Sequence, residues 1–300
     1  MKRAIILGAG GLIGKTVAAR FRAAEVPVVA VDLFVQKEEP GIQWVQGSVS
    51  DEKLLTQLLQ EGDDIFHFAH GGFPGNPTEW EDGLKALDGL KKLCHFAAER
   101  HCRIIFPSSG GTVYGEAMVP VISEQHPLNP VSVYGLLKKM SEELIVFYGR
   151  LHELNYVVIR IANCYGSGFR KGKPQGIIGV AAQSILEQNP LNLVGSGQQI
   201  RDFIHAKDVA GLCARIFASN CGSVIVNVGS GKGHSMLDIV RLVEKQLEKP
   251  AIIEWLPARA FDVQQNVLDS TLAEKMFNWS PTITIEEGIA ETCEQLKKEV

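Results

Sequence analysis

The sequence predicts an α/β fold with a doubly wound parallel sheet, because short apolar segments alternate along the chain with longer amphipathic ones. Residues 12–25 and 132–154 carry apolar side chains at spacings of three and four, which is typical of helices that pack on a sheet. The short apolar segments, each of strand length, are residues 4–7, 28–31, 43–45, 65–68, 103–106 and 157–161.

A second, smaller α/β lobe is predicted after Gly166, where this alternation loosens into SGFRKGKPQG. From Gly229 the chain carries two more helical patterns around a strand-like segment at 252–255. The division is expected to follow these changes of pattern. One domain would comprise residues 1–165 with about 203–228, and the smaller lobe residues 166–202 and 229–300.

The composition excludes several classes of protein. The 300 residues are 45% apolar and 21% charged, which allows a full core and argues against disorder. The net charge of −4 and the pI of about 6.1 give no sign of a basic patch for nucleic acid or an anionic membrane. The six cysteines never approach a C-x-x-C spacing, so we expect neither a metal site nor a disulfide framework. No apolar run suits a membrane span or a signal peptide, so we expect a soluble, cytoplasmic protein.

A glycine-rich turn, GAGGLIG, follows the first predicted strand. Gly8, Gly11 and Gly14 have the G-x-x-G-x-x-G spacing. Glycine at these points lets the chain turn tightly, brings backbone N–H groups against a pyrophosphate and lets the helix pack closely on the strand. The motif predicts a dinucleotide site, and a purely structural turn is the alternative.

Asp32 ends the second predicted strand, eighteen residues after Gly14. A carboxylate at this place can accept hydrogen bonds from both hydroxyls of the adenosine ribose and would repel a 2′-phosphate. Asp32 therefore favours NAD over NADP, although Lys37 nearby leaves NADP open. The alternative interpretation of Asp32 is a solvated residue at a strand end.

Tyr134 and Lys138 lie four residues apart in a predicted helix, so both side chains project from one face. A tyrosine with an ordinary pKa of ~10 is a poor base at neutral pH. A lysine ammonium one turn away, together with a nicotinamide cation, would stabilise the phenolate and lower that pKa. The pair predicts a tyrosine base, and an ordinary surface pair is the alternative.

These motifs and several others resemble the nucleotide-sugar epimerase/dehydratase family of extended short-chain dehydrogenases/reductases, in particular UDP-glucose and UDP-GlcNAc 4-epimerases. The resemblance covers nearly the whole chain. It is carried by GAGGLIG, IFHFAH, SSGGTVYGE, NPVSVYGLLKKMSEE, IRIANCYG, VGSGQQIRDFIHAKDVA, NVGSGKGHSMLDIV and LDSTLAEKMFNWSPTITIEEGI. It implies a Rossmann-like NAD lobe, a smaller lobe that grips a nucleotide-diphosphate sugar, and a reaction at sugar C4.

The resemblance also implies the residues of each site. Asn266 stands at the position that faces the sugar 2-substituent and leaves room for an N-acetyl group, and helices around 84–98 and 132–147 would form a homodimer interface. The NAD contacts fall on Gly8, Gly10, Gly11, Leu12, Ile13, Gly14, Asp32, Ser48, Val49, Phe68, Ala69, Tyr134 and Lys138. The sugar nucleotide would be held by Ser109, Tyr134, Asn163, Arg201, Arg259, Asp262 and Asn266, and an arginine suits phosphate oxygens because it can pair with two of them.

The segment SSGGTVYG would lie beside Tyr134 at the end of the fifth strand. We assign Ser109 as the hydroxyl that assists Tyr134, with Ser108 and Thr112 as alternatives. Related dehydratases and decarboxylases carry carboxylates just before the V-Y-G, where this chain has Gly111 and Thr112. The resemblance therefore favours C4 epimerisation of a UDP-Glc/Gal or UDP-GlcNAc/GalNAc type of sugar, through a transient 4-keto sugar. The alternatives are a 4-keto-sugar reductase that uses NAD(P)H and a non-catalytic NAD-binding protein.

Two departures from the family lie close together in the sequence. The usual asparagine of one helix is replaced by Ala86 or Leu84, depending on the alignment. The preceding segment HGGFPGNPTEW, residues 70–80, is either a loop on the substrate side or an ordinary surface loop.

Overall fold

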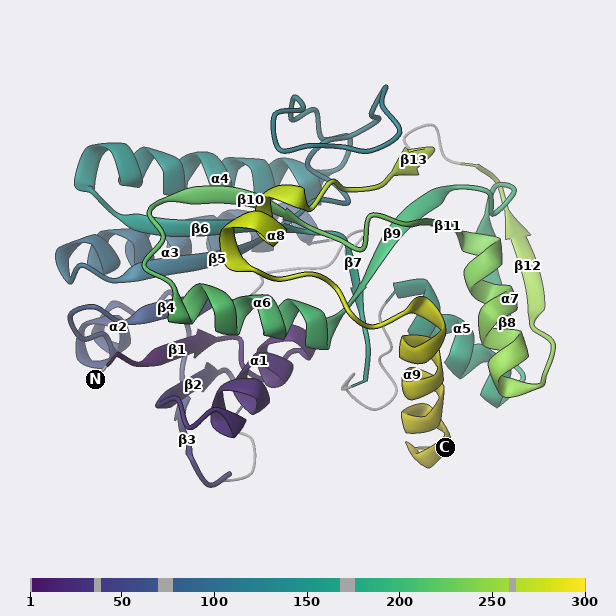
Figure 1. The fold of residues 1–300 in the computed structure, drawn as a ribbon, viewed down its shortest axis with the longest axis horizontal. Coiled ribbons are helices and arrows are strands. Elements are labelled where there is room, and N and C mark those ends of the chain that lie inside the picture. The colour runs from purple at the N-terminus through teal and green to yellow at the C-terminus, as the bar shows by residue number, and fades with distance from the viewer. Residues whose placement is uncertain (1, 35–38, 70–77, 168–175, 259–262, 300) are drawn as a thin grey trace.

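The computed structural model describes residues 2–34, 39–69, 78–167, 176–258 and 263–299. Lys37, Arg259 and Asp262, and residues 70–77 of the loop singled out above, lie outside these ranges. Figure 1 shows a large sheet between two layers of helices, with a smaller group of helices and strands beside the sheet.

Seven parallel strands form the central sheet, in the order β3-β2-β1-β4-β5-β6-β10. The strand order reverses between β1 and β4, which is the place where open α/β sheets bind their ligands. The predicted doubly wound parallel sheet is confirmed. The strands are β1 (Ala4–Leu7), β2 (Val28–Asp32), β3 (Ile42–Gln46), β4 (Asp64–His67), β5 (Arg103–Ser109), β6 (Asn155–Ile161) and β10 (Val224–Val228).

Alternate residues of each strand pack on opposite faces of the sheet. Ile6 belongs to one apolar core and Ile5 and Leu7 to the other, so the run AIIL buries both faces. Three helices cover the first face, namely α1 (Leu12–Ala23), α6 (Ala206–Ala218) and α8 (Thr271–Phe277) (Figure 1). The second face is covered by α2 (Glu52–Leu58), α3 (Glu79–Glu99) and α4 (Val133–His152).

The smaller group has its own apolar core around Ile178, Val240 and Ile289. These residues come from three helices, α5 (Gly176–Glu187), α7 (Met236–Leu247) and α9 (Ile285–Glu299). A short mixed sheet contains β7 (Asn163–Tyr165), β9 (Ile200–His205), β11 (Gly233–Ser235) and β13 (Gln265–Asn266), and β8 (Pro190–Val194) pairs with β12 (Ile252–Leu256).

The chain returns from the smaller group to the central sheet. Helix α6 packs against α1, and β10 pairs with β6 at the edge of the sheet. Phe277 and Trp279 also belong to the core on this face, and the Trp279 Nε1–H donates to the Asp208 carbonyl at 3.0 Å. The division into lobes at the boundaries given above stays a prediction.

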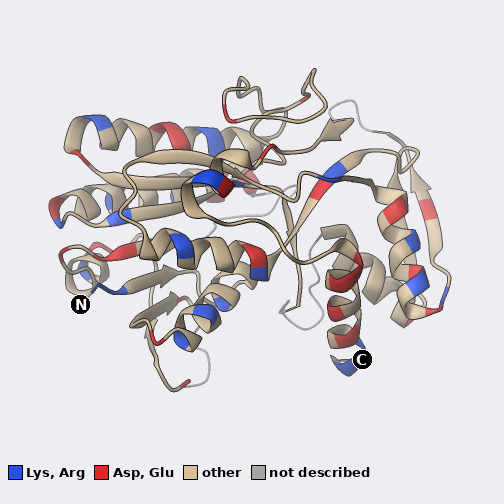
Figure 2. Ribbon diagram, in the orientation of Figure 1, with Lys and Arg blue, Asp and Glu red and all other residues tan. Residues whose placement is uncertain are grey.

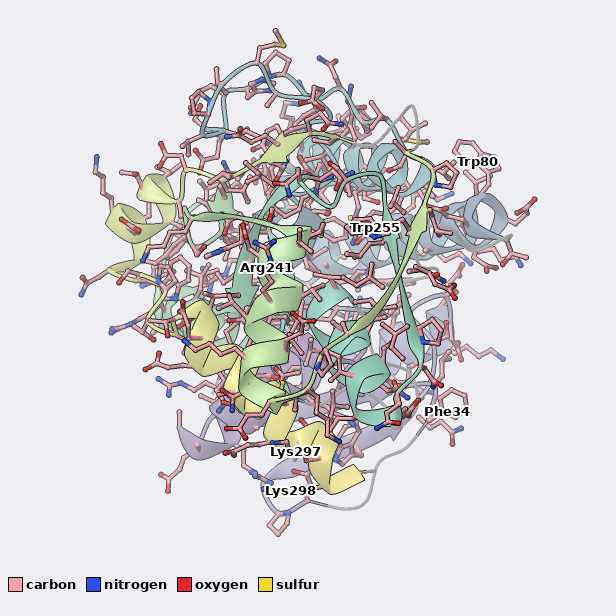
Figure 3. All side chains as sticks on the ribbon, turned by 90° about the vertical axis from the view of Figure 1, so that its right-hand side faces the viewer. Phe34, Trp80, Arg241, Trp255, Lys297 and Lys298 are labelled. Atoms are coloured by element: carbon pink, nitrogen blue, oxygen red, sulfur yellow. The ribbon has the colours of Figure 1, made fainter. Side chains whose placement is uncertain are left out.

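Charged residues of both signs are interspersed over the elements (Figure 2). In the view onto the smaller group, Arg241 of α7 lies in front of the central sheet, and Phe34 and Trp80 lie toward one edge of the molecule (Figure 3). Among the described helices, none combines the length and the apolar character that crossing a membrane requires.

Candidate active site

The glycine-rich turn follows β1 and opens α1. Gly8 has a φ of +80°, and a Cβ there would lie 2.4 Å from the backbone nitrogen of Ala69. A Cβ on Gly14 would lie 2.3 Å from the Gly8 carbonyl oxygen. Neither contact leaves room for a side chain, so the tight strand-to-helix turn needs glycine at both ends.

The start of α1 presents backbone donors beside a carboxylate. Gly11 caps the helix with no side-chain hydrogen bond, so the first-turn N–H groups of Leu12 and Ile13 are left for an outside acceptor. The Gly10 N–H donates to Asp32 Oδ2 at 2.8 Å, which holds the half-buried carboxylate at the turn. A Cβ on Gly10 would lie 2.8 Å from the same oxygen and fill this cradle. The donors fit a pyrophosphate and the carboxylate fits ribose hydroxyls, as the sequence predicts for a dinucleotide.

The other predicted cofactor residues lie at the same carboxyl edge of the sheet. Ser48 and Val49 follow β3, and Val49 packs near Gly89 of α3. Phe68 and Ala69 follow β4, and the Phe68 N–H donates to the Leu7 carbonyl at 2.7 Å. The structure thus places these residues around the turn, at the edge where such sheets bind nucleotides.

Helix α4 presents Tyr134 and Lys138 to the end of β5. The Ser132 hydroxyl accepts the Gly135 N–H at 3.1 Å and caps the helix just before Tyr134. Lys138 is buried, its Nζ donates to the Pro107 carbonyl at 2.8 Å, and it lies 5.8 Å from the Tyr134 ring centre. The predicted pair therefore shares one face of the helix and points at the strand that carries Ser109.

A side-chain hydrogen bond joins Ser109 and Tyr134, and it lowers the pKa of the tyrosine. Burial acts in the opposite direction and is stronger, and the charge of Glu79 adds to it, so that the pKa of Tyr134 is raised to about 12. We expected the Lys138 ammonium to lower this pKa, but that effect is absent among the causes of the shift. Tyr134 is therefore a phenol at neutral pH in the protein's own environment.

Burial also lowers the pKa of Lys138, to about 8, while the charge of Glu142 raises it. Glu142 lies one turn further along α4 and is buried. Its carboxylate accepts three hydrogen bonds from the buried Arg160 guanidinium, at 3.1, 3.1 and 2.7 Å, and one from the Ser108 hydroxyl. Arg160 pairs in register with Ser108 across β5 and β6.

This ion pair extends to Tyr114 of the same SSGGTVYG segment. Arg160 Nη1 donates to the Tyr114 hydroxyl at 2.9 Å, and that hydroxyl donates to Asn227 Oδ1 at 2.7 Å. Ser108 is thus committed to the buried network, whereas Ser109 contacts Tyr134. Of the two adjacent serines, only Ser109 is joined to the tyrosine by a hydrogen bond in the described structure.

Sequence reasoning missed Glu142, Arg160, Glu79 and His67. Glu79 begins α3 and lines a small cavity together with His67, Tyr134 and Lys138. Glu79 comes from the segment 70–80, so the described end of that segment lies at the active site. Ala86, one of the two residues that replace the usual asparagine, also lines this cavity.

Three predicted substrate residues lie on either side of the SSGG turn. The Asn266 Nδ2 donates to the Gly110 carbonyl at 3.0 Å, and Asn266 is fully buried. A Cβ on Gly111 would lie 3.7 Å from Asn163 Nδ2, which is ordinary contact, so Gly111 faces Asn163 with room for a side chain. Arg201 lies beside Asn266 in register, on the strand between β11 and β13.

The segments behind these residues are fixed by Asp202, whose side chain is fully buried. Its carboxylate accepts the Ser230, Gly231 and Leu268 N–H groups at 2.9, 3.1 and 3.2 Å. The Asn163 Nδ2 donates to the Asp202 carbonyl at 2.9 Å. Arg259 and Asp262, the two other predicted substrate residues, lie outside the described residues.

Comparison with known proteins agrees with this geometry. A putative UDP-glucose 4-epimerase of Methanocaldococcus jannaschii is 27% identical over 98% of both chains, and a dTDP-4-dehydro-6-deoxyglucose reductase of Escherichia coli is 28% identical over 95% of this chain and 94% of the relative. The solved UDP-glucose 4-epimerase of Thermotoga maritima, with UDP-glucose, has the same fold, with a TM-score of 0.90 and 24% identity over 99% of each chain. The model of the NAD dependent epimerase/dehydratase family matches residues 4–229. The chain therefore belongs to the NAD-dependent epimerase/dehydratase family, and its cofactor is NAD.

Proposed function

We propose that the protein epimerises C4 of a nucleotide-diphosphate sugar with NAD, through a transient 4-keto sugar. The observation that carries this proposal is the arrangement at the end of β5. Ser109 is hydrogen-bonded to Tyr134, and Gly111, which carries no carboxylate, faces Asn163. Elimination of water or loss of carbon dioxide needs a further acid or base at that place. Oxidation and reduction at one carbon need only the tyrosine.

When bound, NAD would supply the acceptor for the C4 hydride and the source of its return. The chain's own residues hold and move the proton. Tyr134 takes the proton of the 4-hydroxyl during oxidation and gives it back during reduction, while Ser109 fixes the phenol by its hydrogen bond. Lys138, whose pKa of about 8 keeps it mostly charged at neutral pH, lies 5.8 Å from the Tyr134 ring centre.

We assign the binding of NAD to the turn and the strand ends. The backbone N–H groups of Leu12, Ile13 and Gly14 would hold the pyrophosphate, Gly11 would let it approach the turn closely, and Asp32 would hold the adenosine ribose. Ser48, Val49, Phe68 and Ala69 would line the adenosine and the nicotinamide half, and Lys138 would hold the nicotinamide ribose.

The sugar nucleotide would be held from the other side. Arg201, with Arg259 and Asp262, would bind its phosphates and ribose, and Asn163 would lie along the diphosphate. Asn266 would face the sugar 2-substituent and leave room for an N-acetyl group, so the site would admit a UDP-GlcNAc/GalNAc pair as well as a UDP-Glc/Gal pair. The relatives named UDP-glucose 4-epimerases support a uridine nucleotide.

A 4-keto-sugar reductase is the second candidate. The pKa of about 12 for Tyr134 favours this activity, because a reductase uses the tyrosine as an acid that protonates the 4-oxygen. The Escherichia coli relative bears the name of such an enzyme. A non-catalytic role is disfavoured because both Tyr134 and Lys138 are in place.

We also propose a homodimer through α3 and α4. Leu84, Leu136 and Phe147 of these helices are 41%, 39% and 49% exposed, and Leu84, Met140 and Leu144 line a groove between the two helices. Burying this apolar surface against a second copy would remove it from water.

The proposed function is tested by identifying the released dinucleotide and then following UDP-, dTDP- and GDP-sugars by NMR. We expect NAD to stay bound through purification. We also expect the protein to interconvert a pair of 4-epimers without added cofactor. Tyr134→Phe should bind NAD normally and lose about a hundredfold or more of the rate. Net consumption of added NAD(P)H with a 4-keto sugar, and no epimer, would replace the proposal with the reductase.

A further inference from the structure

A small cavity of about 40 Å³ lies beside Tyr134, between the ends of β4 and β5 and the helices α3 and α4. This volume is large enough for water. Most of its wall is apolar and comes from Ala69, Gly83, Ala86, Leu90 and Phe106. Charges in such surroundings act on one another far more strongly than they do in water.

Each element around the cavity contributes a polar group, either to the cavity wall or directly to Tyr134. Helix α3 contributes Glu79, whose Oε1 is buried, and β4 contributes His67, which is 4% exposed. Helix α4 contributes Lys138 and Ser141, and β5 contributes Ser109 through its hydrogen bond. Within the described ranges, His67 Nδ1 is buried and makes no hydrogen bond, so it offers the cavity one more polar partner.

Glu79 and Lys138 are the acidic and the basic group that line this cavity. Burial and the nearby Lys138 charge lower the pKa of His67 to about 4, so His67 is neutral. Lys138 is mostly positive, and the Glu79 carboxylate is the negative group that acts on Tyr134. The same carboxylate raises the pKa of Tyr134, because a phenolate there would repel it.

We propose that Glu79 is a positioning residue that acts through Tyr134: its carboxylate shares the wall of the cavity with the phenol and adds to burial in opposing formation of the phenolate. In the returning half-reaction the Tyr134 O–H bond breaks and an O–H bond forms at the sugar 4-oxygen as a hydride returns to C4. Glu79 favours this step and keeps the 4-keto sugar short-lived. This consequence rests on the proposed function, whereas the effect on the protonation of Tyr134 does not.

The decisive experiment is an ultraviolet titration of tyrosinate in Glu79→Gln. The titration of Tyr134 is isolated by subtracting the same curve measured with Tyr134→Phe in the same background. We expect Tyr134 in Glu79→Gln to ionise about one pH unit lower than in the unaltered protein, which is the effect of one nearby charge. Circular dichroism at each pH restricts the comparison to folded protein.

Glu81→Gln is the matched control. Glu81 also lies in the first turn of α3, so its substitution removes the same charge from the same helix end, but its side chain is exposed. Glu81→Gln should leave the titration of Tyr134 unchanged, and Glu79→Asp, which keeps the charge, should stay closer to the unaltered protein than Glu79→Gln does. If Tyr134 ionises at the same pH or higher in Glu79→Gln, or if Glu81→Gln produces an equal shift, the inference is wrong.

The pH dependence of the reaction separates this inference from the proposed function. With a substrate of the enzyme, the acid limb of the rate in the oxidising direction should move to lower pH in Glu79→Gln. If the acid limb of Glu79→Gln lies one pH unit lower, its rate at a pH well below the limb is up to about tenfold higher than that of the unaltered enzyme. A purely structural role would lower the rate at every pH and would contradict the inference. A lowered ionisation pH of Tyr134 in a protein that epimerises no nucleotide sugar would refute the proposed function and leave the role of Glu79 intact.

Discussion

Replacing Glu142 by glutamine tests the buried ion pair that joins α4 to β5 and β6. Glutamine has nearly the same shape but removes the charge that faces Arg160, which donates three hydrogen bonds to the carboxylate and is itself buried. Leaving a guanidinium buried without its charged partner costs about 3–5 kcal/mol of stability. Because glutamine keeps one oxygen that can accept from Arg160, we expect a loss at the lower end, about 3 kcal/mol. With an unfolding entropy of about 2.1 cal/mol/K for each of the 300 residues, this corresponds to a fall in Tm of roughly 5 °C, measured by circular dichroism or calorimetry.

The neighbouring Glu143 supplies the control, because its side chain is 67% exposed and its ion pair with Lys139 spans 4.0 Å. Glu143→Gln should change stability by less than about 0.5 kcal/mol. Adding Arg160→Met to Glu142→Gln should recover part of the loss, since the stranded charge is then gone. Equal Tm values for Glu142→Gln and Glu143→Gln would refute the reasoning.

The same substitution has a signature that thermal stability does not report. The Glu142 charge raises the pKa of Lys138, so glutamine should lower that pKa below its value of about 8. Lys138 would then lose its proton at a lower pH, and activity should decline at a lower alkaline pH than in the unaltered enzyme. An unchanged alkaline limb would show that Glu142 acts on stability alone.

Four further outcomes are expected. Ser109→Ala should lower the rate by about a hundredfold while Ser108→Ala mainly lowers Tm, and a larger loss of rate for Ser108→Ala would reverse the assignment. The pKa of His67 falls from 6.5 to about 4 on folding, so the unfolded chain binds more protons between these values and stability falls by about 3 kcal/mol as pH drops through this window. Denaturant titrations of His67→Gln should lack that fall. Gly14→Ala should weaken NAD binding, measured by calorimetry, because its Cβ would meet the Gly8 carbonyl at 2.3 Å, and tight binding would contradict this. Leu84→Glu should halve the mass seen by sedimentation, and a monomeric unaltered protein would disprove the dimer.

The fold could be predicted from the sequence because both faces of the central sheet are buried. Continuous apolar runs such as AIIL occur where helices cover a sheet on both sides, and they mark the strands without reference to distant contacts. The end of β5 was harder to predict. Pro107, Ser108 and Ser109 continue the strand by pairing with residues 159–161, and their polar or cyclic side chains conceal this pairing.

The site was predicted where one local stretch carries the chemistry. The glycine turn and the spacing of Tyr134 and Lys138 are local, and the structure has a tight turn at Gly8 and puts Tyr134 and Lys138 on one face of α4. The protonation of Tyr134 was not predictable, because it depends on burial and on Glu79, which comes from a different segment. One signal was available for the ion pair, since Arg160 interrupts the apolar run VVIRI and a buried charge needs a partner.

The late position of α6 and β10 in the chain has a consequence for when the central sheet can fold during synthesis. Strand β10 completes the sheet beside β6, and α6 shields α1, yet both follow a segment that belongs to the smaller group. A fragment that ends near residue 165 would leave β6 as a bare edge and the apolar face of α1 in water, with Val209, Leu212 and Ile216 missing from the core. Helix α8 and Trp279 also belong to this core, so during synthesis the central sheet cannot be fully covered before residue 279 has left the ribosome.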